Sequence, residues 1–505
     1  MKLTDKNIIL ILIISLFISM EVFLYLDYRI DDAYIHLQYA RQWVRTGDYA
    51  FNYKTPQYSD TSPLWVFLLA LGNKITNVDM YLLCKLYGLL FAILSLIVMY
   101  KCLKPMNGNI PILGVLLLAI DFWFRKFAFS GMETPMAVFW IITFYYLYLS
   151  DGRSIYLSSI SLGLLSLTRP EGYFLLPFVC ADIILKHGRF SIKKIFLFML
   201  CFFLTVAPWC VYAIPIFGTI LPYSATLKSS FVLDMNAVWH NALKVSLLLG
   251  SDMLPFILCT IVGALISPIS FFKKNWIYLG WVIFVVIIYV VRVGNISSRY
   301  TVLLIPPVII SGLINLELIQ IKYNKHKLIY ALLGVSGFLS ILFNYLVDVP
   351  YKKNYMDLLK NTEIYAGNWI RNNTTRDVKV ASFDVGAVGY FSEREIIDYW
   401  FLVTPDARYG LDDALIRYKP QYLLFKQKQG EPDFRCPDTA TCSKIFDHSH
   451  EGYRFFEPAP LRVILYELKW NLSDGGVKTF NGFLSPLKPE IYRTNSSGNF
   501  SNSVG

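Results

Sequence analysis

The feature that most constrains the fold of this chain is a series of long apolar blocks between its N-terminus and about residue 347. A helix crosses the roughly 30 Å of hydrocarbon in a bilayer with about 20 mostly apolar residues. Charged residues make up only 16% of the chain, against about 25% in soluble domains. We predict about eleven membrane-spanning helices, at 8–26, 79–101, 109–124, 134–150, 154–168, 172–186, 194–217, 243–271, 276–292, 300–320 and 328–347.

Basic residues between the spans predict how the chain is oriented. Cytoplasmic loops carry an excess of Lys and Arg. With a cytoplasmic N-terminus, the residues that fall inside are Lys101, Lys104, Lys186, Arg189, Lys193, Lys194, Lys273, Lys274, Lys322, Lys325 and Lys327. Arg125 and Lys126 fall outside and oppose the pattern. The segment 8–26 is longer than a signal-peptide core and lacks a small-residue cleavage site, which favours an uncleaved first helix.

Two conclusions follow from this arrangement. An odd number of spans places the C-terminal part outside, in the periplasm or its equivalent, if the protein lies in a bacterial inner membrane. The net charge of +11 is explained by loops that set topology, so we expect no nucleic-acid partner.

Residues 349–493 differ in character and predict a small soluble α/β domain. The segment 361–371 has the pattern of an amphipathic helix, and the segments 377–383, 420–425 and 462–468 have that of strands. We therefore divide the chain into a membrane domain (1–348), this extracytoplasmic domain (349–493) and an Asn/Ser/Gly-rich tail (494–505) of a composition typical of disorder.

Two of the eight cysteines, Cys436 and Cys442, lie in the hydrophilic part, and the other six lie in or beside apolar spans. In an oxidising compartment the two would pair across a short loop. Two free thiols fit the sequence equally well.

The first external loop, residues 27–78, is the most informative for function. Asp31 and Asp32 directly follow a membrane helix, where carboxylates are costly unless they are functional or face water. Residues 32–43 have a helical pattern that places Asp32, His36 and Tyr39 on one side. A helix N-cap is the simpler explanation of the acidic pair, although a cap needs only one acidic residue. Pro63 predicts the start of a second helix that lies near the interface.

Further charged residues occur at the external ends of the later spans. Glu133 precedes the fourth, Arg169 joins the fifth and sixth, and Arg292 and Arg299 flank the connection before the tenth. External loops are usually poor in Arg. The planar guanidinium group matches phosphate oxygens, whereas the simpler explanation is an arginine that reaches up to the interface. Together with the acidic pair, these arginines predict a site for a phosphate-bearing lipid beside a proton acceptor.

These segments, taken in order, resemble a known superfamily. They are Asp31-Asp32-Ala33-Tyr34-Ile35, Tyr39-Ala40-Arg41, Thr61-Ser62-Pro63-Leu64-Trp65, Gly131-Met132-Glu133-Thr134, Arg169-Pro170-Glu171-Gly172 and, in the soluble part, residues 380–390. The set is similar to the GT-C membrane glycosyltransferases, and most similar to the branch of terminal arabinofuranosyltransferases that use polyprenyl-phosphate arabinose.

The resemblance implies a role for each matching residue. Asp31 or Asp32 would be the catalytic base, and Glu133 a second acidic group near the donor sugar or a metal. The residues expected to bind the donor and its phosphate are His36, Arg41, Arg169, Arg292, Arg299 and Tyr300. Partners would be a polyprenyl-phosphate sugar, membrane lipids and an extracytoplasmic glycan, lipid or protein acceptor.

Several alternatives remain open at this stage. The sequence does not distinguish arabinofuranose from mannose, aminoarabinose or another pentose. It names no cofactor, and a divalent cation held by carboxylates stays an open question because no ligand set is legible. A Gly-rich nucleotide fingerprint is absent, which favours a lipid-linked donor. A transporter or lipid flippase would place its charges near the bilayer midplane and often repeat its halves. A non-enzymatic assembly factor would use the acidic pair only as a helix cap.

Overall fold

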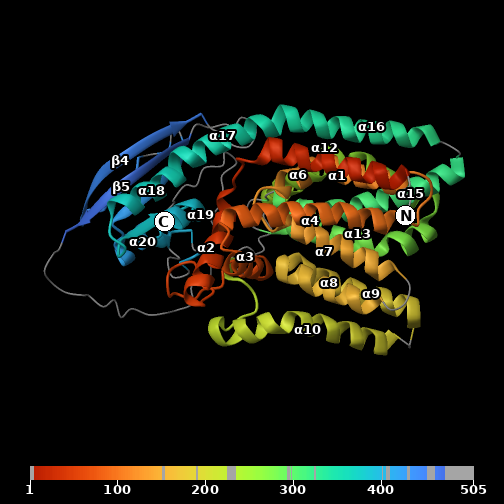
Figure 1. The fold of residues 1–505 in the computed structure, drawn as a ribbon, viewed down its shortest axis with the longest axis horizontal. Helices are drawn as coiled ribbons and strands as arrows, with labels where there is room; N and C mark the ends of the chain where they lie inside the picture. The colour runs from red at the N-terminus through yellow and green to blue at the C-terminus, as the bar shows by residue number, and fades with distance from the viewer. Residues whose placement is uncertain are drawn as a thin grey trace.

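The computed structural model describes residues 5–150, 154–188, 191–224, 235–292, 296, 298–323, 326–400, 402–404, 410–428, 431, 433–451 and 461–471. Long helices form a bundle, and a small mixed sheet packs at one end of it (Figure 1). The predicted disordered tail at 494–505 lies outside the described residues, as do Arg189 and Lys325.

A helix occupies each of the predicted spans, as their apolar composition requires. The bundle contains α1 (Asp5–Tyr25), α4 (Met80–Leu103), α5 (Ile110–Ile120), α6 (Phe122–Ala128), α7 (Thr134–Leu149), α8 (Ser154–Thr168), η1 (Pro170–Leu175), α9 (Leu176–His187), α10 (Ser191–Phe217), α12 (Met235–Ile266), α13 (Pro268–Val291), α14 (Ser298–Thr301), η3 (Val302–Leu304), α15 (Ile305–Tyr323) and α16 (His326–Phe343).

Not every one of these helices is long enough to cross a membrane by itself. Among the described residues, five helices are long and apolar enough to cross a membrane, at 5–25, 80–103, 191–217, 268–291 and 298–322. A sixth qualifies if the bent helix α12 counts as one span. Shorter apolar helices at 63–76, 110–120, 134–149 and 155–168 lie among them. The chain is thus a membrane protein with many apolar helices, and the number eleven stays a prediction.

The predicted span 109–124 is in fact two helices. Asp121 breaks it with an extended backbone (φ −55°, ψ 125°) and caps the second helix by accepting a 2.7 Å hydrogen bond from the Phe124 N–H. Helix α6 carries Arg125 and Lys126, the two residues that oppose the charge rule. Arg125 forms a buried 2.8 Å ion pair with Glu21, and the Lys126 ammonium lies 4.2 Å from the centre of the Tyr351 ring. These contacts give both basic side chains partners within the protein.

The bundle leads into the C-terminal part without a loop. Helix α16 continues through the π-helical turn η4 (Asn344–Asp348), α17 (Val349–Leu359), the second π-helical turn η5 (Lys360–Ile364) and α18 (Tyr365–Asn373), which form one long arc in Figure 1. The predicted helix 361–371 is confirmed. The proposed boundary between residues 348 and 349 falls inside this arc, where hydropathy drops although the helix continues.

The C-terminal part contains a five-stranded sheet in the described residues, with the order β2-β1-β3-β5-β4. Its strands are β1 (Lys379–Ser382), β2 (Glu395–Asp398), β3 (Tyr422–Lys428), β4 (Ala440–His450) and β5 (Leu461–Trp470). β1 pairs in parallel with β2 and β3, and the pairs β3–β5 and β5–β4 are antiparallel. Helix α19 (Gly386–Ser392) follows β1, and α20 (Leu411–Tyr418) precedes β3.

Three of the five strands were predicted and two were not. The segments 377–383, 420–425 and 462–468 contain β1, β3 and β5. Strand β2 is only four residues long, and β4 is rich in charged and polar residues because much of it is exposed at the edge of the sheet. Cys436 and Cys442, beside and within β4, form a disulfide with their Cα atoms 5.9 Å apart, so the paired state is the one that the fold contains.

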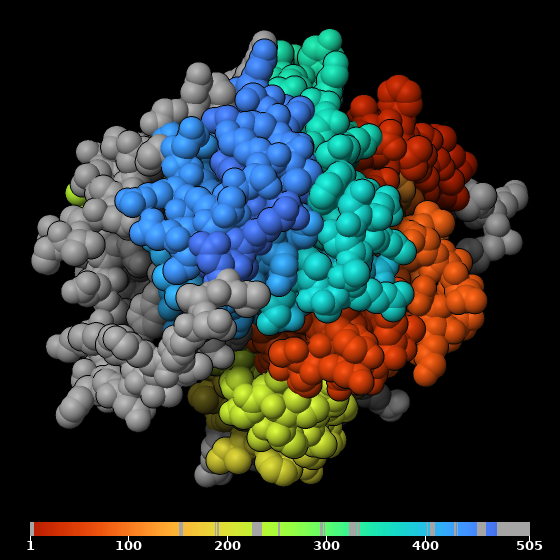
Figure 2. Space-filling model, turned by 90° about the vertical axis from the view of Figure 1, so that its left-hand side faces the viewer, coloured from red at the N-terminus to blue at the C-terminus, as the bar shows by residue number. Residues whose placement is uncertain are grey.

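The predicted external loop lies between bundle and sheet. Its helices α2 (Asp31–Thr46) and α3 (Pro63–Thr76) run across the end of the bundle, and α2 packs against α19 (Figure 1). Seen from the side of the sheet, this loop borders α17 and α18 (Figure 2). Trp65, in the first turn of α3, is fully buried beside the rings of Tyr87 and Phe91.

Candidate active site

The site begins with a tight turn that brings the start of α7 against α2. Gly131 has φ +90°, a conformation that glycine adopts without strain. A Cβ atom there would lie 2.9 Å from Sγ of Cys84 and 3.3 Å from Cβ of Ala33. Glycine therefore lets this turn approach α2 closely, and the approach carries Glu133, two residues later, to His36.

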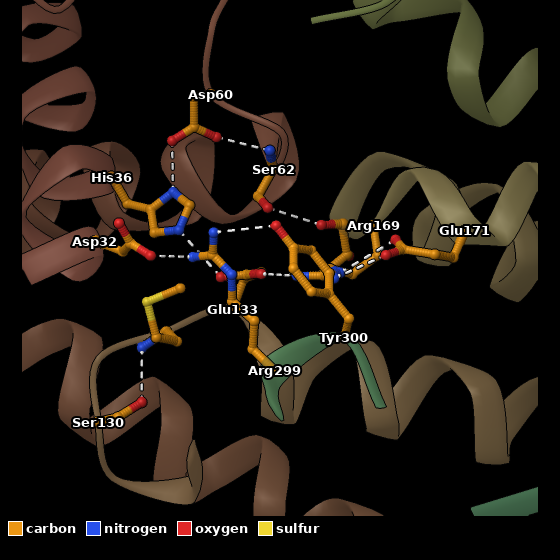
Figure 3. A network of polar contacts seen from close by, with 12 residues as sticks. Asp32, His36, Asp60, Ser62, Ser130, Glu133, Arg169, Glu171, Arg299 and Tyr300 are labelled. Carbon is orange, nitrogen blue, oxygen red and sulfur yellow. Dashed lines mark hydrogen bonds and ion pairs between the residues drawn. The ribbon is translucent and has the colours of Figure 1, made fainter. Parts of the chain in front are cut away.

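His36 lies between two buried carboxylates (Figure 3). Its Nδ1 is 2.5 Å from Oδ2 of Asp60, and its Nε2 is 3.0 Å from Oε2 of Glu133. Burial alone would lower the pKa of His36, but the charges and hydrogen bonds of Asp60 and Glu133 outweigh it and raise the pKa to about 10. Both ring nitrogens therefore donate, and His36 is a cation at neutral pH.

Glu133 continues this network into a second ion pair. Its Oε1 accepts a 2.7 Å hydrogen bond from Arg169, whose other guanidinium nitrogens donate to Glu171 at 2.8 and 3.3 Å. Burial would raise the pKa of Glu133, but His36 and the nearby arginines hold it well below its usual range. Glu171 also accepts a 2.7 Å hydrogen bond from the Tyr289 hydroxyl. The result is a buried row of alternating charges from Asp60 to Glu171.

Asp32 and Arg299 form a separate ion pair beside this row. Arg299 comes from α14, which brings the start of the last predicted spans to the loop helix α2. The ring of Tyr300 lies against three guanidinium groups, those of Arg292, Arg169 and Arg299, at 4.6, 5.1 and 5.2 Å from its centre. An electron-rich ring face holds such cations together without neutralising them.

Exposure distinguishes Asp32 from the rest of the network. Its side chain is 43% exposed and that of Arg299 is 19% exposed, whereas His36, Asp60, Glu133, Arg169 and Glu171 are all buried. The network therefore opens to its surroundings at the Asp32–Arg299 pair. A carboxylate and a guanidinium at that opening suit a reaction that moves a proton and binds a phosphate.

Asp31, next to Asp32, faces the other way. Its carboxylate accepts hydrogen bonds from the backbone N–H groups of Gly386 (3.1 Å) and Ala387 (2.6 Å) at the start of α19. A Cβ atom on Gly386 would lie 2.1 Å from the carbonyl oxygen of Asp31, so this close contact requires glycine. Burial, and then the charge of Asp384, raises the pKa of Asp31 well above its usual value. The N-cap of α2 is Ile30, so neither aspartate caps that helix.

The structure brings together most of the predicted site residues, but Arg41 lies elsewhere. Asp32 and His36 share one side of α2, as predicted, and the Tyr39 hydroxyl on the same side accepts a 3.3 Å hydrogen bond from the Ser59 N–H. Arg41 lies on the opposite side of the helix. It stacks on the ring of Tyr390, 4.3 Å from the ring centre, and donates a 2.8 Å hydrogen bond to the Tyr390 carbonyl.

Sequence reasoning missed two members of the network. Asp60, just before the predicted helix start at Pro63, was not singled out, yet its carboxylate accepts hydrogen bonds from His36 and from the Ser62 N–H, the latter at 2.7 Å. Glu171 was quoted only as part of a motif. Asp60 lies just before a helix start and Glu171 lies two residues after an arginine, and that context was the available signal.

No group of three or more His, Cys, Asp or Glu side chains in the described part of the chain is arranged to hold a metal ion. Asp60 and Glu133 are instead joined through His36. The acidic side chains of the network have arginine or histidine partners.

Comparisons with known proteins identify solved structures that share this fold. The crystal structure of ArnT from Cupriavidus metallidurans bound to undecaprenyl phosphate is 10% identical, with a TM-score of 0.59 over 90% of this chain and 97% of ArnT. The apo oligosaccharyltransferase of Archaeoglobus fulgidus is 12% identical, with a TM-score of 0.55 over 84% of this chain and 69% of that one. AglB from the same organism, in complex with an inhibitory peptide and a dolichol-phosphate, is 10% identical, with a TM-score of 0.50 over 83% and 69%.

At these identities the likeness shows the fold alone, which this chain shares with ArnT and the archaeal oligosaccharyltransferases. The arabinofuranosyltransferase branch stays a prediction. A family model described as a domain of unknown function (DUF8728) matches residues 353–473, which include the sheet. No curated protein matches the chain.

Proposed function

We propose that this protein is a membrane glycosyltransferase that moves a sugar from a polyprenyl-phosphate donor to an acceptor hydroxyl. The observation that carries the proposal is the partly exposed Asp32–Arg299 pair at the open end of a buried charge network. The fold shared with ArnT and the archaeal oligosaccharyltransferases supports it. The undecaprenyl phosphate bound to ArnT and the dolichol-phosphate bound to AglB support a lipid-linked donor.

Asp32 acts as the general base in this proposal. The acceptor oxygen attacks the anomeric carbon, its proton passes to the Asp32 carboxylate, and the bond from that carbon to the phosphate oxygen breaks. The leaving lipid phosphate keeps the bonding electrons and gains one negative charge. A positioned base typically accelerates such a step by about 10²–10⁴-fold.

Arg299 binds the phosphate, and Arg292 adds positive charge beside it. Arg299 is now held by Asp32, so an incoming phosphate would replace this carboxylate and release Asp32 to accept a proton. Both arginines lie against Tyr300, which keeps their positions while the charge on the phosphate grows. Preorganised charge of this kind stabilises the developing anion without further rearrangement.

The buried residues hold the exposed pair in place. Arg169 already donates to Glu133 and Glu171, so we assign it to positioning Glu133. Glu133 in turn fixes His36, which lies one helical turn from Asp32 on the same side of α2.

The experiment is release of polyprenyl phosphate by the full-length protein in lipid nanodiscs. Donors are polyprenyl-phosphate arabinofuranose, which the resemblance favours, and polyprenyl-phosphate mannose. We expect release from one donor by the wild type and a loss of at least about 100-fold in Asp32→Asn. Asp27→Asn, an exposed acid in the same loop, is the matched control and retains activity. Full activity in Asp32→Asn would show that the base is another residue.

The orientation of the protein belongs to this proposal as well. We place the N-terminus in the cytoplasm, and the site, the disulfide and the sheet on the extracytoplasmic side of a bacterial inner membrane. The disulfide Cys436–Cys442 supports that side, because disulfides persist in oxidising compartments.

A further inference from the structure

The sheet of the C-terminal part contains a change of direction at β1. Chain order runs from β1 to β2 on one side of it, and then to β3 on the other side. The crossing segments carry α19 and α20. In open sheets of parallel strands, the carboxyl ends on either side of such a change leave a crevice, and ligands bind there. Here the change of direction lies between the ends of β1 and β3.

Polar groups meet at this place. Asp384 follows β1, and its carboxylate forms a 2.8 Å ion pair with Lys426 of β3. The Lys426 ammonium also lies 3.9 Å from the buried carboxylate of Glu363. Two carboxylates, those of Asp384 and Glu363, thus flank one ammonium. This excess of negative charge disfavours an anionic ligand and suits a neutral molecule that offers hydroxyl groups.

Two large aromatic side chains lie beside these charges and face outward. Phe383 is 39% exposed and Trp400 is 50% exposed, and their ring centres are 5.0 Å apart. The turn that presents Trp400 is held firmly, because the buried Asp398 carboxylate accepts hydrogen bonds from the N–H groups of Trp400 (2.7 Å) and Val403 (2.9 Å). An exposed aromatic pair on a fixed turn is the kind of surface that marks a binding site.

These strand ends also adjoin the candidate active site. Asp384 is close enough to Asp31 for its charge to act on that carboxylate. Asp31 holds the start of α19, and Asp32 is the next residue of α2. A molecule resting on the aromatic pair would therefore extend toward the proposed base.

We propose that the carboxyl ends of the neighbouring strands β2, β1 and β3, with Trp400, Phe383, Asp384 and Lys426, form the subsite for a saccharide acceptor. One face of a sugar ring carries C–H groups of partial positive charge, which favour the electron-rich face of an aromatic ring. Asp384 accepts hydrogen bonds from sugar hydroxyls, and Lys426 donates to them. The inference rests on the proposed function for its last step, in which Asp32 takes the proton of the acceptor.

The test measures saccharide binding without a donor, so that it is independent of the transfer reaction. Full-length protein in lipid nanodiscs is used, because sugar-headed detergents would compete for the subsite. The probes are trisaccharides of arabinofuranose and of mannose, followed by saturation-transfer-difference NMR. The variants are Trp400→Ala and Phe383→Ala/Trp400→Ala. Ile416→Ala, which removes an exposed apolar side chain of the same sheet domain in α20, is the matched control.

We expect at least one trisaccharide to bind the wild type and Ile416→Ala equally. We expect its affinity to fall about tenfold in the double variant, because two ring contacts are lost. In a transfer assay the same variant would raise the acceptor KM much more than it lowers kcat. Equal binding by wild type and double variant, or binding of neither trisaccharide by the wild type, would overturn the subsite. Failure of the proposed function would appear separately, as no release of lipid phosphate while trisaccharide binding persists.

Discussion

The carboxylate of Asp31 accepts a 2.6 Å hydrogen bond from the backbone N–H of Ala387, 356 residues later in the chain. The neighbouring Asp32 instead pairs with Arg299. The two aspartates look equivalent in the sequence, yet one joins the loop to the C-terminal sheet domain and the other lies at the open end of the charge network. This division underlies the first two predictions.

Gly386→Ala should separate α19 from α2. The new Cβ would lie 2.1 Å from the carbonyl oxygen of Asp31 and 2.7 Å from its carboxylate, so the backbone must shift. We expect a loss of stability of about 1–3 kcal/mol, the usual range for an overpacked contact. Thermal unfolding measures it, with Gly334→Ala as the control, because a Cβ there meets nothing within 4 Å. Equal unfolding temperatures in the two variants would contradict the contact.

Asp31→Asn should mainly lower stability, whereas Asp32→Asn should mainly lower turnover. An amide at position 31 keeps one acceptor for two N–H donors, so we expect a loss of about 1–2 kcal/mol in stability and partial activity. Asp32 is 43% exposed, so its amide should leave stability almost unchanged but abolish release of lipid phosphate. Thermal unfolding and donor turnover, measured side by side, distinguish the two. A destabilised Asp32→Asn with normal turnover would show that Asp32 has a structural role and is not the base.

Substitutions of Arg169 and Arg299 should also have different effects, the first on stability and the second on donor binding. Arg169→Met leaves the buried Glu133 and Glu171 without their shared arginine. Breaking such a buried pair costs about 3–5 kcal/mol. Arg299→Gln breaks a partly exposed pair and should cost about 1 kcal/mol or less, while the KM for the donor rises. Unfolding temperature and donor kinetics check both. An unchanged donor KM in Arg299→Gln would remove Arg299 from the phosphate site.

His36 should contribute to stability in a pH-dependent way. Its pKa is raised from 6.5 to about 10 by Asp60 and Glu133, so the folded state binds this proton more tightly than the unfolded state. The stabilisation is complete below about pH 6.5 and is lost as the pH rises through about 10. The difference in unfolding temperature between wild type and His36→Gln should therefore be largest at pH 6 and shrink toward pH 10. A difference that grows with pH would show that His36 is neutral.

The disulfide allows a test of orientation. In right-side-out vesicles, a membrane-impermeant maleimide should label Cys436 and Cys442 only after a reductant is added. The variant Cys436→Ser/Cys442→Ser sets the background from the six remaining cysteines. Labelling before reduction would show free thiols. Labelling that requires permeabilised vesicles would place the sheet in the cytoplasm.

Local sequence patterns were enough to predict where most helices lie and which residues share one side of α2. Helix α3 begins at Pro63 as predicted, and the four-residue spacing of Asp32 and His36 places both on one side of α2. These features depend on neighbours in the sequence. The break at Asp121 was missed because the surrounding apolar composition continues through it.

The sequence by itself thus determined a membrane bundle, a small C-terminal sheet domain and a set of charged residues that any function must explain. Only the tertiary structure decided how those charges are paired. Asp60 reaches His36, Arg299 reaches Asp32, and Asp31 reaches α19 through contacts between segments far apart in the chain. The physical reason is that hydropathy and helical period are local properties, whereas a buried charge takes its partner from whichever segment the packing brings beside it.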